Sequence, residues 1–319
     1  MPSRPGESVM WATMQGQAEA LARLIAKPGP VGRVAERLAG RRVLVIGTGT
    51  SWHAAEQGAW LLRCAGLLVR AAQSADAALD HGLLADTEIV IALSHTGAKR
   101  FTAEATALAQ ERGVDVVRIG GIDVADMDLH TVVRERSACY TVSHLAALLR
   151  LAQLAEALGA DLGPLTEIPN AVEALVRTPV DVAPPARLIE FIGVGINQWT
   201  AAEGALKIRE AAYVASEGLS VEQFLHGPSV ALRENDHLVC LDGGGPLSSR
   251  IGEIATAAER SGVPVTTIAD HRLSEPLSIF PLTAAVQRIA LESAELLGTN
   301  PDSFGRDVPG REPWTSVSL

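Results

Sequence analysis

The sequence predicts an α/β protein made of two tandem, doubly wound parallel-sheet domains that are related by duplication. Short apolar runs are each followed by a glycine turn and a helix-compatible segment, the pattern of a βα unit. The glycine loop Gly47-Thr48-Gly49 recurs as Gly193-Val194-Gly195, and the pattern Trp-x-Ala-Ala-Glu that begins at Trp52 recurs at Trp199. The length of 319 residues agrees with about two domains of about 150 residues each.

The chain opens with a lead-in segment, residues 1–30. From Val9 to Ala26 its apolar residues stand at helical spacing, and Lys27-Pro28-Gly29-Pro30 then stops the helix. We therefore expect one helix ahead of the first domain.

The first predicted domain covers residues 31–165. Three apolar runs predict buried parallel strands, at 43–46, 89–93 and 115–119. Helical segments are predicted at 52–63, from the loop at 94–97 to Arg112, and at 141–158.

The second predicted domain covers residues 180–315, and a helix flanked by Gly163-Pro164 and Pro184-Pro185 joins it to the first. Its strands are predicted at 188–192, 237–241 and 265–268. The charged stretch 203–210 runs into a largely apolar stretch, 211–217, so we expect one long buried helix there.

Composition excludes several classes of protein. Hydrophobic residues make up 47% of the chain and charged residues 20%, as in an ordinary globular protein. The net charge of −10, with no basic stripe, argues against a nucleic-acid partner. Three widely spaced cysteines argue against a disulfide framework, and no apolar stretch has the length of a signal or membrane segment. We expect a cytoplasmic protein with no membrane partner.

Two loops carry hydroxyl groups at strand ends. Gly49, Thr50 and Ser51 follow the first strand, but position 52 is Trp and position 198 is Gln, so neither glycine loop has the dinucleotide-binding pattern. A second such loop follows the next strand and contains Ser94, His95 and Thr96. Both loops open helices, whose free N–H groups attract anions, so together they predict a phosphate site. The alternative is that these hydroxyls only cap their helices.

A charged face is predicted in the second domain. Glu203, Lys207 and Glu210 share one side of a helix. A solvated salt-bridge face is the simple interpretation, but a buried helix requires its charges to be paired or functional. His226 stands in a turn before Gly227-Pro228 and is a candidate acid or base, although a lone histidine is more often structural. The histidines show no metal-binding spacing, and we expect neither a metal nor a cofactor.

These motifs, in this order, resemble the tandem sugar isomerase (SIS) family, whose domains are flavodoxin-like. The carriers of the resemblance are Gly49-Thr50-Ser51, Ser94-x-Thr96-Gly97, the segment from Glu203 to Glu210 and His226-Gly227-Pro228. The similarity extends over residues 30–315 and is greatest to the isomerase half of the glucosamine-6-phosphate synthases and to free-standing phosphosugar deaminases, isomerases and deglycases.

The resemblance implies a role for each motif. Gly49, Thr50, Ser51, Ser94, His95 and Thr96 would bind the sugar phosphate, and Glu203 would belong to the substrate-binding set. Glu210 would move a proton between C1 and C2 of the open-chain sugar, Lys207 would act at the carbonyl oxygen, and His226 would open the ring. In the family this histidine reaches the site of a neighbouring subunit, which implies a homodimer.

The sequence also departs from the family pattern. Ala98-Lys99 replaces Glu-Thr in the phosphate loop, which removes a hydroxyl and offers Lys99 as a charge partner. Glu135-Arg136-Ser137-Ala138-Cys139 replaces a Ser-Thr-Lys stretch, and Arg306 is the candidate substitute for a C-terminal lysine. The start at Met1-Pro2-Ser3 leaves no room for a glutaminase half, so we expect no glutamine-derived ammonia.

Three functions follow as hypotheses. The first is a deaminase/isomerase that converts glucosamine 6-phosphate to fructose 6-phosphate and ammonia. The second is a deglycase that acts on a phosphorylated fructosamine-amino acid by the same enediol chemistry. The third is a non-catalytic sugar-phosphate-binding protein.

Overall fold

The computed structural model describes residues 8–180, 187–315 and 317. The first seven residues of the lead-in segment and Pro184-Pro185 of the connecting segment lie outside the described residues. The chain divides into two compact units. The first-sheet unit comprises residues 19–135 and 142–166, and the second-sheet unit comprises the other described residues, including the short segment 136–141.

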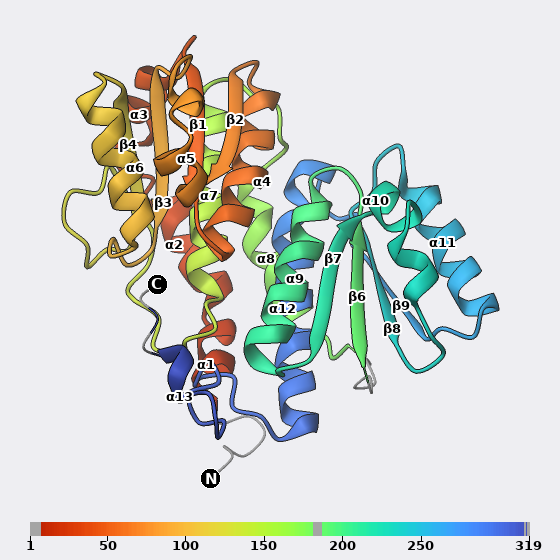
Figure 1. Ribbon diagram of the computed structural model, residues 1–319. Helices are drawn as coiled ribbons and strands as arrows, with labels where there is room; N and C mark the ends of the chain where they lie inside the picture. Colours follow the sequence, from red (N-terminus) through yellow and green to blue (C-terminus); the bar gives the residue numbers. More distant parts are fainter. Residues whose placement is uncertain (1–7, 181–186, 316, 318–319) are drawn as a thin grey trace. The chain divides into compact units, whose positions relative to one another are not determined.

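The first-sheet unit is built on five parallel strands in the order β2-β1-β3-β4-β5 (Figure 1). Their bounds are β1 Arg42–Gly47, β2 Leu68–Gln73, β3 Ile89–Ser94, β4 Asp115–Gly120 and β5 Leu129–His130. β3 is buried along its whole length, and β1 after its first residue. Because a parallel sheet is covered on both faces, such strands are continuous apolar runs rather than alternating ones.

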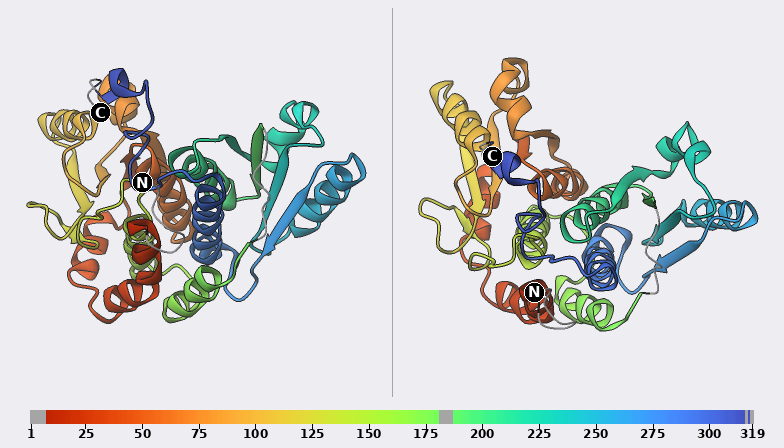
Figure 2. Two further views of the ribbon diagram at one scale, coloured as in Figure 1. Left: turned by 90° about the horizontal axis from the view of Figure 1, so that it is seen from below. Right: turned by 60° about the horizontal axis from the view of Figure 1, so that its bottom comes forward.

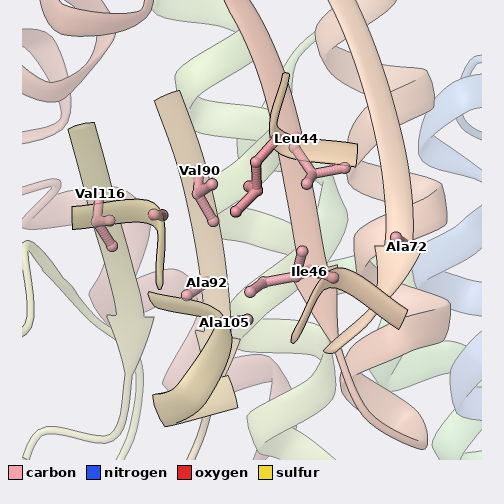
Figure 3. Packing of buried hydrophobic residues seen from close by; sticks show 10 residues of the cluster. Leu44, Ile46, Ala72, Val90, Ala92, Ala105 and Val116 are labelled. Atoms are coloured by element: carbon pink, nitrogen blue, oxygen red, sulfur yellow. The ribbon is translucent and has the colours of Figure 1, made fainter. Parts of the chain in front are cut away.

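Helices surround this sheet. Their bounds are α2 Gln17–Ala26, α3 Val31–Leu38, α4 Thr50–Cys64, α5 Ser74–Leu79, the 3-10 turn His81–Leu84, α6 Arg100–Glu111 and α7 Val142–Ala157. One face of the sheet packs through Leu44, Ile46 and Val90, against which Ala105 of α6 is buried (Figure 3). This core fixes the strand ends on which the candidate phosphate loops stand.

The second-sheet unit repeats the same strand order with four parallel strands, β7-β6-β8-β9. Their bounds are β6 Leu188–Gly193, β7 Ala215–Ser220, β8 His237–Asp242 and β9 Val265–Ala269. The helices are α1 Val9–Gln15, α8 Ile168–Arg177, α9 Asn197–Ala211, α10 Val221–Leu225, α11 Ser248–Arg260, α12 Ile279–Leu297 and α13 Glu312–Thr315, with 3-10 turns at Leu165–Glu167, Pro228–Ala231 and Glu275–Leu277.

Two predicted helices differ from the structure. The lead-in helix is two helices, since α1 ends at Gly16 and α2 begins at Gln17. The long helix expected through Glu217 was wrong in its second half. α9 ends at Ala211, Tyr213 takes a left-handed conformation with a φ of 60°, and Ala215 begins β7. Apolar content alone does not distinguish a buried helix from a strand.

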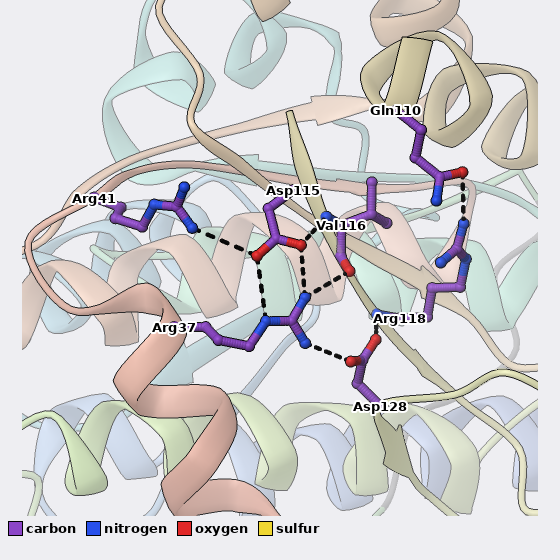
Figure 4. Close-up of polar contacts among 7 residues, drawn as sticks. All are labelled: Arg37, Arg41, Gln110, Asp115, Val116, Arg118 and Asp128. Carbon is purple, nitrogen blue, oxygen red and sulfur yellow. Dashed lines mark hydrogen bonds and ion pairs between the residues drawn. The ribbon is translucent and has the colours of Figure 1, made fainter. Parts of the chain in front are cut away.

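An ionic network fastens α3 to the first sheet (Figure 4). The Arg37 guanidinium donates to both carboxylate oxygens of Asp115, at 3.2 and 2.7 Å, and to Asp128 at 2.5 Å. The hydrogen bond from Arg37 holds the pKa of Asp115 below its ordinary value, against the opposing effect of burial. The bidentate geometry orients α3 along the start of β4.

Glu190 is a carboxyl group buried in the otherwise apolar strand β6 of the second sheet. It lies in the middle of β6, is buried, and its Oε1 has no hydrogen-bond partner among the described residues. In the register of the sheet it lies beside Glu217 of β7. Burial, followed by the negative charges of Glu217 and Asp236, raises the pKa of Glu190 from 4.5 to about 8.

We expect Glu190→Gln to raise the free energy of unfolding by about 2–3 kcal/mol at pH 8, and by less at pH 5. The folded protein keeps a proton on Glu190 that the unfolded chain loses above its ordinary pKa. The stability of the wild type therefore falls as the pH rises toward about 8. Denaturant unfolding of both proteins between pH 5 and 8 measures the difference. The control is Glu253→Gln, at an exposed carboxylate of α11 that does not contribute to the raised pKa of Glu190. A pH-independent difference would contradict the argument.

Over the part of the chain that the structure describes, no helix combines the length and the apolar character needed to cross a lipid bilayer.

Candidate active site

The first candidate loop is a tight turn between β1 and α4. A Cβ atom on Gly47 would lie 2.1 Å from the backbone oxygen of Ser51, so only glycine fits at the end of this strand. Gly49 has a φ of 57° and is the N-cap of α4. Thr50 and Ser51 are the first two residues of the helix, and the N–H of Ser51 donates to the backbone oxygen of Thr48 at 3.2 Å.

The second candidate loop follows β3, the strand next to β1. Ser94 is 8% exposed, and its Oγ has no hydrogen-bond partner among the described residues. Thr96 Oγ1 accepts a hydrogen bond from the N–H of Ala98 at 3.4 Å. A buried hydroxyl without a partner is unfavourable unless a ligand or water completes it, so Ser94 favours a polar ligand here.

Helix capping does not account for these hydroxyls. The N-cap of α4 is Gly49, which has no side chain, and the N-cap of α6 is Lys99, whose side chain makes no capping bond. The helix that was predicted from residues 94–97 onward begins at Arg100 in the structure. Ser94 and Thr96 therefore precede the helix and do not cap it.

His95 lies in this loop, but its ring is engaged within the protein. The Nε2 atom accepts a hydrogen bond from the N–H of Glu135 at 3.3 Å, and a Cβ atom on Gly121 would lie 3.5 Å from the ring. Burial lowers the pKa of His95, and the carboxylates of Glu135 and Asp123 act in the opposite direction. A neutral imidazole that supports the loop between β4 and α7 fits these contacts.

The charged residues of the second-sheet unit form a buried cluster on α9. The side chains of Glu203 and Lys207 are 0% and 1% exposed, and that of Glu210 is 14% exposed. Lys207 Nζ lies 3.4 Å from Glu203 Oε1 and 2.5 Å from Glu210 Oε2. The solvated-face interpretation is therefore wrong, and the predicted burial is confirmed.

The electrostatics of the cluster favour its charged form. Burial by itself lowers the pKa of Lys207, but the adjacent carboxylates of Glu203 and Glu210 outweigh burial and hold this pKa well above its usual value. Lys207 is thus a fixed ammonium group. An ammonium group has three N–H bonds, and the carboxylates of Glu203 and Glu210 lie within reach of two of them.

Close packing explains why this face of α9 is buried. The helix contacts β6, β7 and α12, which lie around it within the same unit (Figure 2). A Cβ atom on Gly204 would lie 3.0 Å from Phe191 of β6 and from Val286 of α12. Glycine at this position lets the helix approach both elements, and the neighbouring Glu203 and Lys207 are enclosed as a result.

Cys139 also belongs to this cluster, although no sequence motif marked it as a site residue. Its Sγ lies 3.6 Å from Glu210 Oε2, and its side chain is fully buried. Burial raises the pKa of this thiol well above its ordinary value, although the Lys207 ammonium acts to lower it. The sequence offered only its position in the stretch that departs from the family pattern.

Two further candidates, His226 and Arg306, are exposed. His226 is the C-cap residue that follows α10, its side chain is 79% exposed, and its Nε2 atom lies 3.9 Å from Glu222 Oε2. Arg306 is exposed in the turn region after α12. Within the described residues, no three His, Cys, Asp or Glu side chains are gathered as a metal site.

The corresponding edge of the second sheet is occupied by its own carboxylate. Asp242 ends β8 and accepts hydrogen bonds from the N–H of Gly244 at 2.9 Å and from the Ser248 hydroxyl at 2.6 Å. His271 Nε2 lies 3.2 Å from the same group. The two sheets therefore differ at the edge where ligands bind in such folds.

Comparison with known proteins agrees with this geometry. The model of the SIS domain family matches residues 39–157. Among curated proteins, the chain is similar to the glutamine–fructose-6-phosphate aminotransferase (isomerizing) of Pyrococcus horikoshii, with 29% identity over 298 residues, which is 82% of this chain and 50% of that protein. The chain spans about half the length of the curated relatives it matches.

Solved structures share the fold along most of the chain. Glucosamine-6-phosphate deaminase from Thermotoga maritima has a TM-score of 0.78 and 20% identity, covering 93% of this chain and 97% of that one. The C-terminal domain of glucosamine-fructose-6-phosphate aminotransferase from Francisella tularensis has a TM-score of 0.73 and 17% identity, covering 93% and 98%. At this identity the likeness concerns the fold alone. Both the glycine loop and the serine loop lie within residues 39–157, the part of the chain that is similar to the SIS domain family.

Proposed function

We propose that this protein is a phosphosugar isomerase/deaminase that acts on an amino-sugar or ketose 6-phosphate through an enediol or enediolamine intermediate. Its proposed reaction converts glucosamine 6-phosphate and water to fructose 6-phosphate and ammonia. The observation that carries the proposal is the buried pair of Lys207 and Glu210, 2.5 Å apart, with the carboxylate partly exposed. A fixed cation beside an accessible base suits proton abstraction next to a carbonyl group.

The proposed chemistry has three steps. In open-chain glucosamine 6-phosphate, C1 is an aldehyde and C2 carries a hydrogen and the amine. The Glu210 carboxylate removes the C2 proton, the C1–C2 double bond forms, and the Lys207 ammonium stabilises the negative charge on the C1 oxygen. Glu210 then gives the proton to C1, and a proton passes from the C2 nitrogen to the C1 oxygen, which leaves a hydroxyl group on C1 and an imine at C2. Water hydrolyses this imine to the ketone with release of ammonia.

Phosphate recognition is assigned to the first-sheet unit. The hydroxyls of Thr50, Ser51, Ser94 and Thr96, together with the N-terminus of α4, would bind the sugar phosphate. Lys99, the N-cap of α6, supplies a positive charge to the same loop, where the family pattern has a hydroxyl. Glu203 would act through Lys207, as its buried counter-ion, rather than on the sugar itself.

Two further parts of the proposal concern the assembly. The shared strand order β2-β1-β3-β4 and β7-β6-β8-β9 supports an origin of the two units by duplication, with a SIS domain in each. The exposed imidazole of His226 is available to a second copy of the chain, so we propose a homodimer in which His226 opens the sugar ring at the partner's site.

Product analysis tests the reaction. We expect purified protein incubated with glucosamine 6-phosphate to release ammonia and fructose 6-phosphate in equal amounts. Release of a free amino acid from a 6-phosphorylated fructosamine-amino acid, without activity on glucosamine 6-phosphate, would indicate a deglycase. Saturable binding of the sugar phosphates with no turnover of either would indicate a non-catalytic binding protein.

We expect Ser94→Ala to separate binding from stability. The Ser94 hydroxyl makes no hydrogen bond within the described protein, so its loss should change the free energy of unfolding by less than about 0.5 kcal/mol. A hydroxyl that donates to phosphate should instead weaken substrate binding about tenfold or more. Titration calorimetry and thermal unfolding measure the two effects. Thr106→Ala, at a hydroxyl in the middle of α6, is the control. Unchanged affinity in Ser94→Ala would remove Ser94 from the phosphate site.

A further inference from the structure

We propose that Cys139 is a positioning residue for Glu210, and that its S–H group orients the carboxylate for proton transfer. The inference rests on the proposed function, because it takes Glu210 as the base.

The two donors meet one oxygen of the carboxylate. Cys139 Sγ lies 3.6 Å from Glu210 Oε2, and Lys207 Nζ lies 2.5 Å from the same atom. Over residues 8–180 and 187–315, no protein donor reaches Glu210 Oε1. One oxygen is therefore held from two sides, and the other is left as the acceptor for a substrate proton.

The segment that carries Cys139 is anchored to the unit that contains α9. The N–H of Ala138 donates to the backbone oxygen of Asp302 at 3.4 Å, and the backbone oxygen of Thr141 accepts from Gln287 at 3.3 Å. The N–H of Cys139 donates to Ser137 Oγ at 3.3 Å. Bonds on both sides of Cys139 keep its thiol beside Glu210.

The environment keeps the thiol in its donor form. Full burial raises the pKa of Cys139 well above its ordinary value, so the sulfur retains its proton at neutral pH. Because an S–H group is a weak donor, we expect it to orient the Glu210 carboxylate more than to stabilise its negative charge. Without it, the single contact with Lys207 allows the carboxylate to rotate, and a displaced base reacts more slowly.

The kinetic test compares two side chains of similar size. Cys139→Val fills the space without a donor, and we expect it to lower kcat about tenfold with KM within about twofold. Cys139→Ser keeps a donor, and we expect its kcat to stay within about threefold of the wild type. Cys240→Val, at the other buried cysteine, is the control and should leave kcat unchanged. Equal losses in the valine and serine variants, or a normal kcat in Cys139→Val, would overturn the role of Cys139.

A spectroscopic test does not depend on turnover. The S–H stretching band of Cys139 is obtained as the infrared difference between the wild type and Cys139→Ala. We expect it to move to higher frequency in Glu210→Gln, because a neutral amide is a weaker acceptor than a carboxylate. An unmoved band would contradict the contact itself. A moved band in a protein that turns over no phosphosugar would retain the contact and reject the proposed function.

Discussion

Glu210→Gln should lower kcat on glucosamine 6-phosphate by about 10³-fold or more while leaving substrate affinity within a fewfold of the wild type. The amide has the shape of the carboxylate but cannot accept the C2 proton. Lys207 keeps its other buried partner, Glu203, at 3.4 Å, so the ammonium remains compensated and the fold should persist. Steady-state kinetics, with ammonia and fructose 6-phosphate both measured, together with calorimetric binding of the substrate, separate the two effects.

The matched control for this variant is Glu253→Gln on α11. Glu253 is an exposed carboxylate of the same unit, 2.9 Å from Arg250, and its replacement should leave kcat unchanged. If Glu210→Gln kept more than about a tenth of the wild-type rate, another group would have to be the base. Loss of binding together with loss of the fold would instead show that Glu210 is needed for the structure.

Lys207→Met should lower the free energy of unfolding by about 3–5 kcal/mol. Methionine has nearly the same length as lysine and fills the same space, but it leaves the fully buried carboxylate of Glu203 without its cation. An uncompensated charge in the interior either destabilises the folded state or takes up a proton. Urea unfolding at pH 7 measures the loss, and catalysis should be lost as well because the cation for the C1 oxygen is gone.

The double variant Lys207→Met, Glu203→Gln distinguishes charge from packing. With both groups neutral, we expect at least about half of the lost stability to return. Lys27→Met, at an exposed lysine just after α2, is the control and should be close to neutral. If the double variant were no more stable than Lys207→Met, the loss would arise from packing around α9 and not from the orphaned carboxylate.

Six of the strands could be predicted from their apolar residues, and all of them except the edge strand β9 are central in their sheets. The runs at 43–46, 89–93, 115–119, 188–192, 237–241 and 265–268 all lie within the observed strands. β2 and β7 are the edge strands next to β1 and β6, and each is partly exposed. Arg70 in β2 and Glu217 in β7 interrupt the apolar pattern, so neither strand has the continuous run of a buried one.

The candidate site was predictable from motifs only in part. The helical spacing of Glu203, Lys207 and Glu210 predicts that they share a face, which the buried contacts confirm. A compositional signal was also available, because the chain has 24 arginines and only three lysines, one of which is Lys207. A single compact ammonium fits between two carboxylates where a guanidinium fork does not.

Cys139 could not be found in this way. It is 71 residues from Glu210 along the chain, and only the folded loop between β5 and α7 brings its sulfur to the carboxylate. The partnerless Ser94 hydroxyl is likewise a property of packing, since the sequence shows a hydroxyl but not whether the protein satisfies it.

Because of the Asp242 carboxylate, the two sheets carry different charges at their corresponding strand ends. At the end of β8, the backbone N–H of Gly244 and the Ser248 hydroxyl already surround a negative charge supplied by the protein itself. A phosphate dianion that approached the end of β8 would have to displace the Asp242 carboxylate from these donors. Asp242 is part of the chain, so it cannot diffuse away or be diluted. At the end of β3, by contrast, the Ser94 hydroxyl is unclaimed by the described protein. The end of β3 can therefore accept an external anion where the end of β8 already holds one, and we expect one phosphate site in each chain.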